Sequence, residues 1–205
     1  MIQTLRVDLA ERAYDIRIGD GLIARAGAEI APLTGPRSGV AVLTDRTVAE
    51  LYLEPLRQAL AASGIGMQAL VLPTGEATKG WPELIRSVDW LLEQKVERGG
   101  LVIALGGGVI GDLAGFAAAV LRRGVRYVQI PTTLLAQVDS AVGGKTGINA
   151  PQGKNLIGAF HQPSLVLADI SALNTLPGRA FLAGYGEVVK YALLGDAGFF
   201  GWLEA

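Results

Sequence analysis

Four short apolar runs, separated by stretches of helix length, most constrain how this chain can fold. The runs are GVAVLTD (39–45), MQALVLP (67–73), LVIALGGG (101–108) and VRYVQIP (125–131). Continuous apolar runs of this length are typical of strands buried on both faces of a parallel sheet. The stretches between them, 47–64, 81–98 and 109–123, have helical patterns. The order β-α-β-α-β-α-β therefore predicts an α/β fold, a Rossmann-like doubly wound, mainly parallel sheet with helices on both faces.

The N-terminal segment precedes this alternation and has a different pattern. Residues 4–9 and 13–18 alternate polar and apolar side chains, which predicts a β-hairpin. Residues 22–32 are expected to form a helix, and the pair Gly35-Pro36 should end it.

The C-terminal segment contains no further strand pattern. Residues 178–194 and 197–205 look helical, one after the other. We therefore divide the chain into a sheet domain, 1–177, and the first helices of a second, helical domain, 178–205.

Composition restricts the class of protein. The chain has 205 residues, half of them hydrophobic, with a formal net charge of -1 and no cysteine. This charge gives no reason to expect a nucleic-acid or anionic-membrane partner, and without cysteine there is neither a disulfide framework nor a thiolate metal site. No signal-peptide pattern or apolar stretch of about 18 residues is present, so a cytoplasmic protein is expected.

A glycine-rich turn joins the run at 101–108 to the helix that follows. Gly106, Gly107 and Gly108 lie between strand and helix, where glycine lets the backbone approach a ligand and the helix N-terminus attracts phosphate. The spacing is not G-x-G-x-x-G, and a tight turn without a ligand is the alternative. Asp112 in the first helical turn, and the hydroxyls of Thr132-Thr133 after the next strand, favour a ligand because the carboxyl ends of parallel strands share one edge.

Two other strand ends carry charged groups. Asp45 ends the first run, where an acid often binds ribose hydroxyls, although a helix cap would explain it equally well. The cap is otherwise predicted at Thr47, and Pro55 is expected to kink the helix. In the loop 74–80, Glu76 and Lys79 are candidate cofactor contacts, with an ordinary charged loop as the alternative.

The densest group of polar residues lies in VDSAVGGKTGINAPQGKNLIGAFHQP, 138–163. The candidates there are Asp139, Lys145, Asn149, Lys154 and Asn155, with Arg122 and Arg123 upstream. Such a cluster on a glycine-rich backbone suits a small phosphorylated or carboxylated substrate. A solvated loop is the alternative.

Further along the chain, Glu187 and Lys190 lie three residues apart, on one helix face. They are either a site pair or an ordinary ion pair. His161 is the only histidine and lies in an expected loop, so a metal-binding role for it is disfavoured.

Taken together, these motifs resemble the 3-dehydroquinate synthase family. The matching stretches are GGGVIGDLAGF, RRGVRYVQIPTTLLAQVDSAVGGKTGIN, GKNLIGAFHQP, LNTLP and GEVVKYALL, which occur in the family's order and cover essentially the whole chain. The resemblance implies an NAD-binding domain at 1–177 and a metal- and substrate-binding helical domain that begins at 178–205. It also implies the conversion of 3-deoxy-D-arabino-heptulosonate 7-phosphate to 3-dehydroquinate and phosphate, in the shikimate pathway.

In such an enzyme NAD oxidises a substrate hydroxyl transiently, phosphate is eliminated, the ketone is reduced again and an aldol step closes the ring. A divalent metal, zinc or cobalt, holds substrate oxygens. The resemblance places NAD contacts at Asp45, Thr74, Gly75, Glu76, Lys79, Gly107, Gly108, Val109, Ile110, Gly111, Asp112, Thr132, Thr133, Lys145, Lys154, Ala172, Leu173, Asn174 and Thr175. It places catalytic or substrate contacts at Asp139, Lys145, Lys154, Asn155, Lys190 and Arg123, the last reaching the neighbouring subunit of a homodimer. Glu187 matches a metal ligand.

Two departures from the family pattern remain. Thr47 stands where the family has an asparagine, and the two further metal-ligand histidines of the family's helical domain are absent from the 205 residues. We therefore expect an incomplete metal site and no turnover by this chain alone. The alternatives are another sugar-phosphate cyclase, a relative of the glycerol dehydrogenases, or a non-catalytic NAD-binding module.

Overall fold

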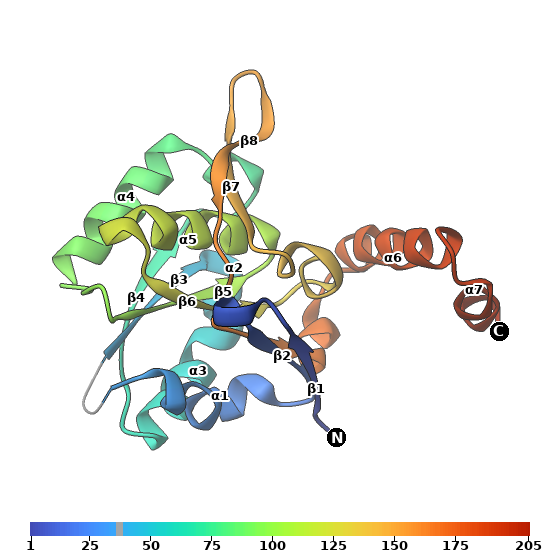
Figure 1. Cartoon of the computed structure of the whole chain (residues 1–205), viewed down its shortest axis with the longest axis horizontal. Coiled ribbons are helices and arrows are strands. Elements are labelled where there is room, and N and C mark those ends of the chain that lie inside the picture. Colours follow the sequence, from blue (N-terminus) through green and yellow to red (C-terminus); the bar gives the residue numbers. More distant parts are fainter. Residues whose placement is uncertain (36–38) are drawn as a thin grey trace.

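A seven-stranded sheet forms the centre of the computed structural model, which describes residues 1–35 and 39–205 (Figure 1). The strand order is β1-β2-β9-β6-β5-β3-β4. The bounds are β1 (Gln3–Val7), β2 (Tyr14–Gly19), β3 (Gly39–Asp45), β4 (Gly66–Leu72), β5 (Leu101–Gly106), β6 (Arg126–Pro131) and β9 (Leu165–Asp169). All neighbours pair in parallel except β1 and β2. The predicted fold class is confirmed.

Two features of this sheet differ from the predicted one. The predicted N-terminal hairpin forms as β1 and β2, but β2 also pairs in parallel with β9, so the hairpin extends the main sheet. β9 itself was not predicted, although all of its residues are buried. It fills the position between β2 and β6.

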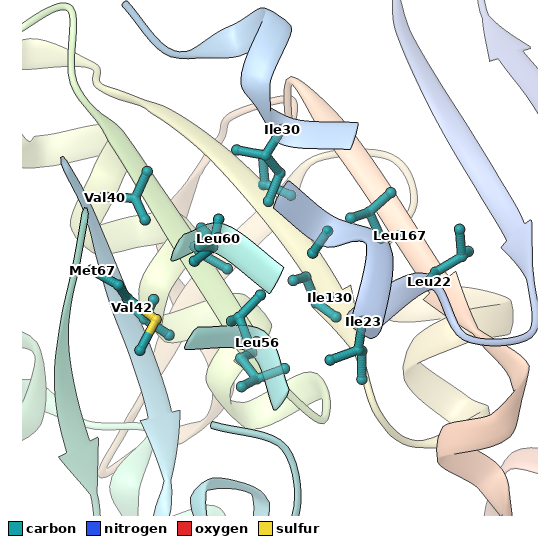
Figure 2. Close-up of a cluster of buried hydrophobic side chains, with 14 of the residues drawn as sticks. Leu22, Ile23, Ile30, Val40, Val42, Leu56, Leu60, Met67, Ile130 and Leu167 are labelled. Carbon is teal, nitrogen blue, oxygen red and sulfur yellow. The ribbon is translucent and has the colours of Figure 1, made fainter. Parts of the chain in front are cut away.

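Helices cover both faces of the sheet (Figure 1). On one face, α1 (Leu22–Ile30) and α3 (Glu54–Ala62) pack against alternate residues of the central strands, as Figure 2 shows for Leu22, Ile23, Leu56 and Leu60. Full burial of such a side chain contributes roughly 1.5–3 kcal/mol. On the other face, α4 (Trp81–Glu93) and α5 (Gly108–Val120) cover the intervening residues of the same strands.

The helix after β3 begins differently from the prediction. Asp45, not Thr47, is its N-cap, because the Asp45 carboxylate accepts a hydrogen bond from the Val48 amide at 3.1 Å. The bounds are α2 (Arg46–Val48), a π-helical segment (Ala49–Leu53) and then α3. The π-helical segment ends two residues before Pro55, which cannot donate a helical hydrogen bond. The break predicted at Gly35-Pro36 falls partly outside the described residues, since Pro36 is not among them.

A second, two-stranded sheet occupies most of the polar, glycine-rich stretch at 138–163, for which no strand was predicted. The hairpin consists of β7 (Lys145–Ala150) and β8 (Gly153–Phe160), which pair antiparallel. Ile148 is fully buried in the core beside α5 and fixes the base of the hairpin. The rest of the hairpin rises away from the main sheet (Figure 1).

Two further helices, α6 (Gly178–Leu193) and α7 (Ala197–Glu204), extend away from the sheet (Figure 1). Gly184 brings α6 against Leu134 and Leu135, since a Cβ at Gly184 would lie 2.5 Å from the Leu135 nitrogen. The domain boundary expected at 177/178 stays a prediction. None of the helices in the described ranges has the length and apolarity needed to cross a bilayer.

Candidate functional site

The candidate site begins at the carboxyl edge of the parallel strands. β3 leads into α3 on one face of the sheet, whereas β5 leads into α5 on the opposite face. The two strands are adjacent and parallel, with Thr44 opposite Leu105, so the connections that follow them reverse from one face of the sheet to the other at this point. A crevice at such a reversal is where ligands bind in open α/β sheets. Asp45 and the turn Gly106–Gly108 lie on its two sides.

The turn between β5 and α5 needs glycine for steric reasons. A Cβ at Gly107 would lie 3.0 Å from the Thr133 methyl carbon, and one at Gly108 would lie 2.9 Å from the Ser140 hydroxyl. Gly107 is the N-cap of α5 and provides no side-chain cap. The first amides of α5 are therefore available to an anionic ligand such as a pyrophosphate.

The adjacent threonines after β6 differ in their contacts. The Thr133 hydroxyl accepts a hydrogen bond from the Ala136 amide at 3.2 Å and thereby starts the next turn. The Thr132 hydroxyl is buried and has no hydrogen-bond partner within the described residues. Because an unpartnered buried hydroxyl is unfavourable, Thr132 is the better candidate for a ligand contact.

A buried ion pair joins the 74–80 loop to α5 and to the hairpin. The Lys79 ammonium, in a side chain only 6% exposed, contacts the carboxylate of Asp112 and the side-chain oxygen of Asn155. Burial raises the pKa of Asp112, and the adjacent Lys79 opposes that rise. The structure thus brings together three predicted site residues from three separate segments.

A more exposed set of contacts lies beside this pair. Glu76 accepts a hydrogen bond from the Asn149 amide group at 2.8 Å, and the Lys154 ammonium lies 3.5 Å from the same carboxylate. The hydrogen bond from Asn149 is the main reason that the pKa of Glu76 is lowered, with Lys154 and Lys79 adding to it. Lys154 itself is largely exposed.

A cavity of about 460 Å³ opens between α5, the turn at 136–140 and the hairpin. Its lining residues are Asp112, Asp139, Ser140, Lys145, Thr146, Gly147, Asn155, Leu156, Gly158, Ala159 and Phe160. The Lys145 ammonium lies 3.5 Å from the Asp139 carboxylate. Carboxylate, ammonium and amide groups on one wall suit a small, polar, anionic ligand.

The predicted pair on α6 lies next to this cavity. Lys190 donates to Glu187, which lowers the pKa of Glu187 and raises that of Lys190. The Tyr191 hydroxyl reaches the Val138 carbonyl at 3.4 Å, so this face of α6 borders the turn at 136–140. In the described ranges no group of three or more histidine, cysteine or acidic side chains could hold a metal. The role of Glu187 as a metal ligand stays a prediction.

Arg123 is a predicted catalytic residue that lies away from the cavity. It follows α5 at that helix's far end, in a surface hollow with Glu97, Arg98 and Arg122. Arg122 and Arg123 both have positive φ, 48° and 66°. Their backbone therefore turns sharply away from the helix axis.

The sequence predicted only some of the residues that make contacts at the end of β9 and in the segment after it. The predicted contacts 172–175 form a 3-10 turn, where the Ala172 carbonyl accepts hydrogen bonds from Tyr52 at 3.2 Å and Thr175 at 3.1 Å. Asp169 was not predicted. Its buried carboxylate accepts from the amides of Gly21 at 2.9 Å and Ile23 at 2.8 Å. The sequence signal that could have identified Asp169 is an acidic residue at the end of an apolar run, a pattern that Asp45 also shows.

His161 has structural contacts. Its ring stacks on Tyr127 with centroids 5.3 Å apart, and its Nε2 lies 2.9 Å from the Val125 carbonyl oxygen. These contacts anchor the end of the hairpin to the turn before β6.

Comparisons with known proteins agree with this geometry. A profile of the family described as 3-dehydroquinate synthase N-terminal matches residues 69–183. A 3-dehydroquinate synthase of Ruegeria sp. is 74% identical over 204 residues, which is 100% of this chain and 54% of that protein. The chain thus spans about half the length of the curated relatives that it matches.

Two solved structures are also similar to this chain. The 2-epi-5-epi-valiolone synthase of Streptomyces hygroscopicus, solved with NAD+ and Zn2+ bound, superposes with a TM-score of 0.87 at 35% identity, over 97% of this chain and 54% of that one. A 2-deoxy-scyllo-inosose synthase complexed with carbaglucose-6-phosphate, NAD+ and Co2+ has a TM-score of 0.82 at 26% identity, over 92% of this chain and 50% of that one. With the family profile matching more than half of its residues, this chain belongs to the 3-dehydroquinate synthase family, of which it contains the N-terminal region.

Proposed function

We propose that this chain is the cofactor-binding half of a 3-dehydroquinate synthase, which converts 3-deoxy-D-arabino-heptulosonate 7-phosphate to 3-dehydroquinate and phosphate. The observation that carries the proposal is the polar cavity of about 460 Å³ beside the glycine turn, with Asp139, Lys145 and Asn155 on its wall. The identity of 74% to a relative of that name supports the choice of reaction.

NAD is the proposed cofactor, as in the two cyclase structures. The free amides of the turn at Gly107–Gly108 would hold its pyrophosphate, and Asp45 and the buried hydroxyl of Thr132 would bind further polar groups. When bound, NAD supplies a reversible hydride transfer at a substrate hydroxyl.

The polar residues of the cavity have proposed roles in binding and orientation. Lys145 and Lys154 provide positive charge for an anionic substrate, and Asn155 orients a substrate oxygen by hydrogen bonding. Asp139 is 3.5 Å from Lys145 and fixes the position of that ammonium. Lys190, on the face of α6 that borders the cavity, is a further substrate contact.

Glu187 is proposed as one ligand of a divalent metal, zinc or cobalt as in the two neighbouring structures. A catalytic zinc normally takes three protein ligands. The described residues provide no group of three, so they do not fit a complete metal site and no step is assigned to a metal here. We therefore propose that the 205-residue chain alone does not release phosphate.

We also propose a homodimer, located in the cytoplasm and acting in the shikimate pathway of aromatic amino acid biosynthesis. Arg123 supports the dimer, because it is a predicted substrate residue that lies in a surface hollow at the end of α5 remote from the glycine turn. From that position it could reach the substrate of a second subunit.

The cofactor assignment is tested by calorimetric titration of the chain with NAD. Binding is expected for the wild-type chain and should weaken at least about tenfold in Gly107→Ala, whose new methyl group would crowd the turn. Gly99→Ala is the matched control, since Gly99 precedes β5 and has open space around it. Equal NAD affinity in both variants would contradict the assignment.

The reaction is tested with a chimera that joins this chain to the remaining half of the Ruegeria relative. Phosphate release from the heptulosonate phosphate, with NAD and zinc supplied, is the expected result. Turnover of a different sugar phosphate would instead favour another cyclase, and an NAD-binding chimera without turnover would favour a non-catalytic module.

A further inference from the structure

Asn149 is a polar residue of the 138–163 stretch to which the proposed function gives no role. It lies near the end of β7, and it makes three hydrogen bonds to other segments. Its side-chain amide donates to Glu76 at 2.8 Å, its side-chain oxygen accepts from the Asn155 amide at 2.9 Å, and its own amide donates to the Lys79 carbonyl at 2.9 Å. A single residue thus joins the 74–80 loop to β8.

The hairpin is irregular at this point. Ile148 pairs with Ile157 but Ala150 pairs with Gly153, so residues 154–156 face Asn149 alone. Asn155 has φ 58°, in the left-handed region. Such a bulge leaves backbone groups without ladder partners and redirects side chains. The Asn149 side chain supplies the missing partner for the Asn155 amide.

The redirected Asn155 side chain reaches the buried ion pair. Its oxygen accepts from Lys79, which also contacts Asp112 at the start of α5. Asn149 therefore contacts both sides of the site. It holds Asn155, a proposed substrate contact, and it holds the loop that carries Glu76 and Lys79, which the sequence predicted as cofactor contacts.

We propose that Asn149 is a positioning residue that fixes Asn155 relative to the 74–80 loop and so aligns the substrate wall with the cofactor edge. The inference rests on the proposed function for the meaning of that alignment. Asparagine suits the position because it offers a donor to the Glu76 carboxylate and an acceptor to the Asn155 amide at once. Aspartate would keep the acceptor but place a second negative charge against Glu76.

This difference gives a test on the unliganded chain by amide hydrogen exchange. In Asn149→Ala, exchange should accelerate about fivefold or more in both the 74–80 loop and the segment around Asn155, since each segment loses a hydrogen bond. In Asn149→Asp, only the 74–80 loop should accelerate. Gln152→Ala is the matched control, because Gln152 is exposed at the hairpin turn and has no side-chain hydrogen bond in the described structure.

Titration with NAD is the second readout. Affinity should fall several-fold in Asn149→Ala and in Asn149→Asp, and should not change in Gln152→Ala. The role of Asn149 is overturned if Asn149→Ala matches Gln152→Ala in exchange and affinity. It is also overturned if exchange rises equally throughout β5, which would indicate general destabilisation. A wild-type chain that fails to bind NAD would instead contradict the proposed function, while the exchange comparison would still decide whether Asn149 holds the two segments together.

Discussion

At the scale of single residues, two neighbouring threonines that look alike in the sequence have different hydrogen bonding in the structure. Thr133 uses its hydroxyl within the protein, as an acceptor for the Ala136 amide, whereas the buried Thr132 hydroxyl has no partner in the described ranges. The sequence predicted both as cofactor contacts, since both follow β6. Only the structure separates a hydroxyl that shapes a turn from one that is available to a ligand.

This separation predicts the effect of Thr132→Val. Removing a buried hydroxyl that has no partner should leave the free energy of unfolding within about 0.5 kcal/mol of wild type, or raise it slightly. If NAD uses the hydroxyl, its affinity should fall about two- to tenfold, the equivalent of one net hydrogen bond. Chemical denaturation and calorimetry measure the two quantities. Thr34→Val, which removes a hydroxyl bonded to the Ala31 carbonyl, is the control, and unchanged NAD affinity in Thr132→Val would remove Thr132 from the site.

Lys154 should matter for turnover and little for folding. Its side chain is 73% exposed and its contact with Glu76 spans 3.5 Å. Substitution at such a position usually changes stability by less than about 0.5 kcal/mol. Loss of a charge-assisted contact in a closed site costs about 1.5–3 kcal/mol, so Lys154→Ala in the chimera should lower turnover roughly ten- to a hundredfold. Unchanged kinetics would identify Lys154 as an ordinary solvated lysine.

Glu76 makes the contribution of Asn149 to stability dependent on pH. The hydrogen bond from Asn149, and then Lys154 and Lys79, lower the pKa of Glu76 below its ordinary value of 4.5. A lowered pKa means that the stabilisation is present above pH 4.5 and is lost as the pH falls through the folded-state pKa. The difference in unfolding free energy between wild type and Asn149→Ala should therefore be constant near neutrality and shrink in acid. A difference that grows in acid would show that Glu76 is not the group involved.

At the scale of elements, the sequence predicted the N-terminal hairpin and the four strands with continuous apolar runs, but it missed β7, β8 and β9. β3, β5 and β6 are almost entirely buried, as predicted, whereas β4 lies at the edge of the sheet and has exposed residues between its buried ones. The hairpin of β7 and β8 was not predicted, because its glycine-rich composition is typical of a loop. Gly158 is needed there because a Cβ would lie 2.0 Å from the Thr146 carbonyl oxygen, so close strand pairing and loop-like composition coincide.

β9 was missed for a different reason. Its five residues are buried, but no helix precedes them, because the hairpin takes the place of the crossover helix. A prediction based on alternating strands and helices therefore ended at β6 and omitted β9. Asp169, at the end of β9, shows the same pattern as Asp45 and would have revealed the strand.

Two glycines of α6 allow a test of how this helix packs against the rest of the chain. A Cβ at Gly184 would lie 2.5 Å from the Leu135 nitrogen, whereas Gly186 has nothing within 4 Å. Gly184→Ala should destabilise the chain by about 1–3 kcal/mol through overpacking. Gly186→Ala should stabilise it by roughly 0.5–1 kcal/mol, since alanine favours a helix interior. Denaturant unfolding of the two variants measures the difference, and equal effects would mean that α6 is not packed through Gly184.

At the scale of the whole molecule, parallel strands explain why much of the site could be predicted. Residues distant in sequence, such as Asp45, Gly107 and Thr132, meet because the carboxyl ends of β3, β5 and β6 share one edge. The contacts between the 74–80 loop and the hairpin could not be predicted in this way. They depend on a bulge at Asn155, which no periodicity in the sequence indicates.

The exposed face of α6 and α7 predicts how the isolated chain behaves in solution. Leu182, Leu193, Leu194 and Trp202 are 67%, 67%, 74% and 71% exposed, on helices that extend away from the sheet (Figure 1). Exposed apolar side chains gathered on two neighbouring helices favour association, so the chain should self-associate as its concentration rises. Because the cavity and the glycine turn lie elsewhere, a Leu193→Gln, Leu194→Gln variant should associate less and bind NAD as wild type does.

Sedimentation velocity at several concentrations, combined with NAD titration, measures both properties. Ile85→Gln is the control, since Ile85 is also exposed, at 56%, but lies on α4. If the control weakens association as much as the double variant does, the contact is not specific to α6 and α7. If the double variant also loses NAD, the end of α6 is coupled to the cofactor edge. That coupling would run through the turn at 136–140, because the Tyr191 hydroxyl of α6 donates a hydrogen bond to the Val138 carbonyl in this turn.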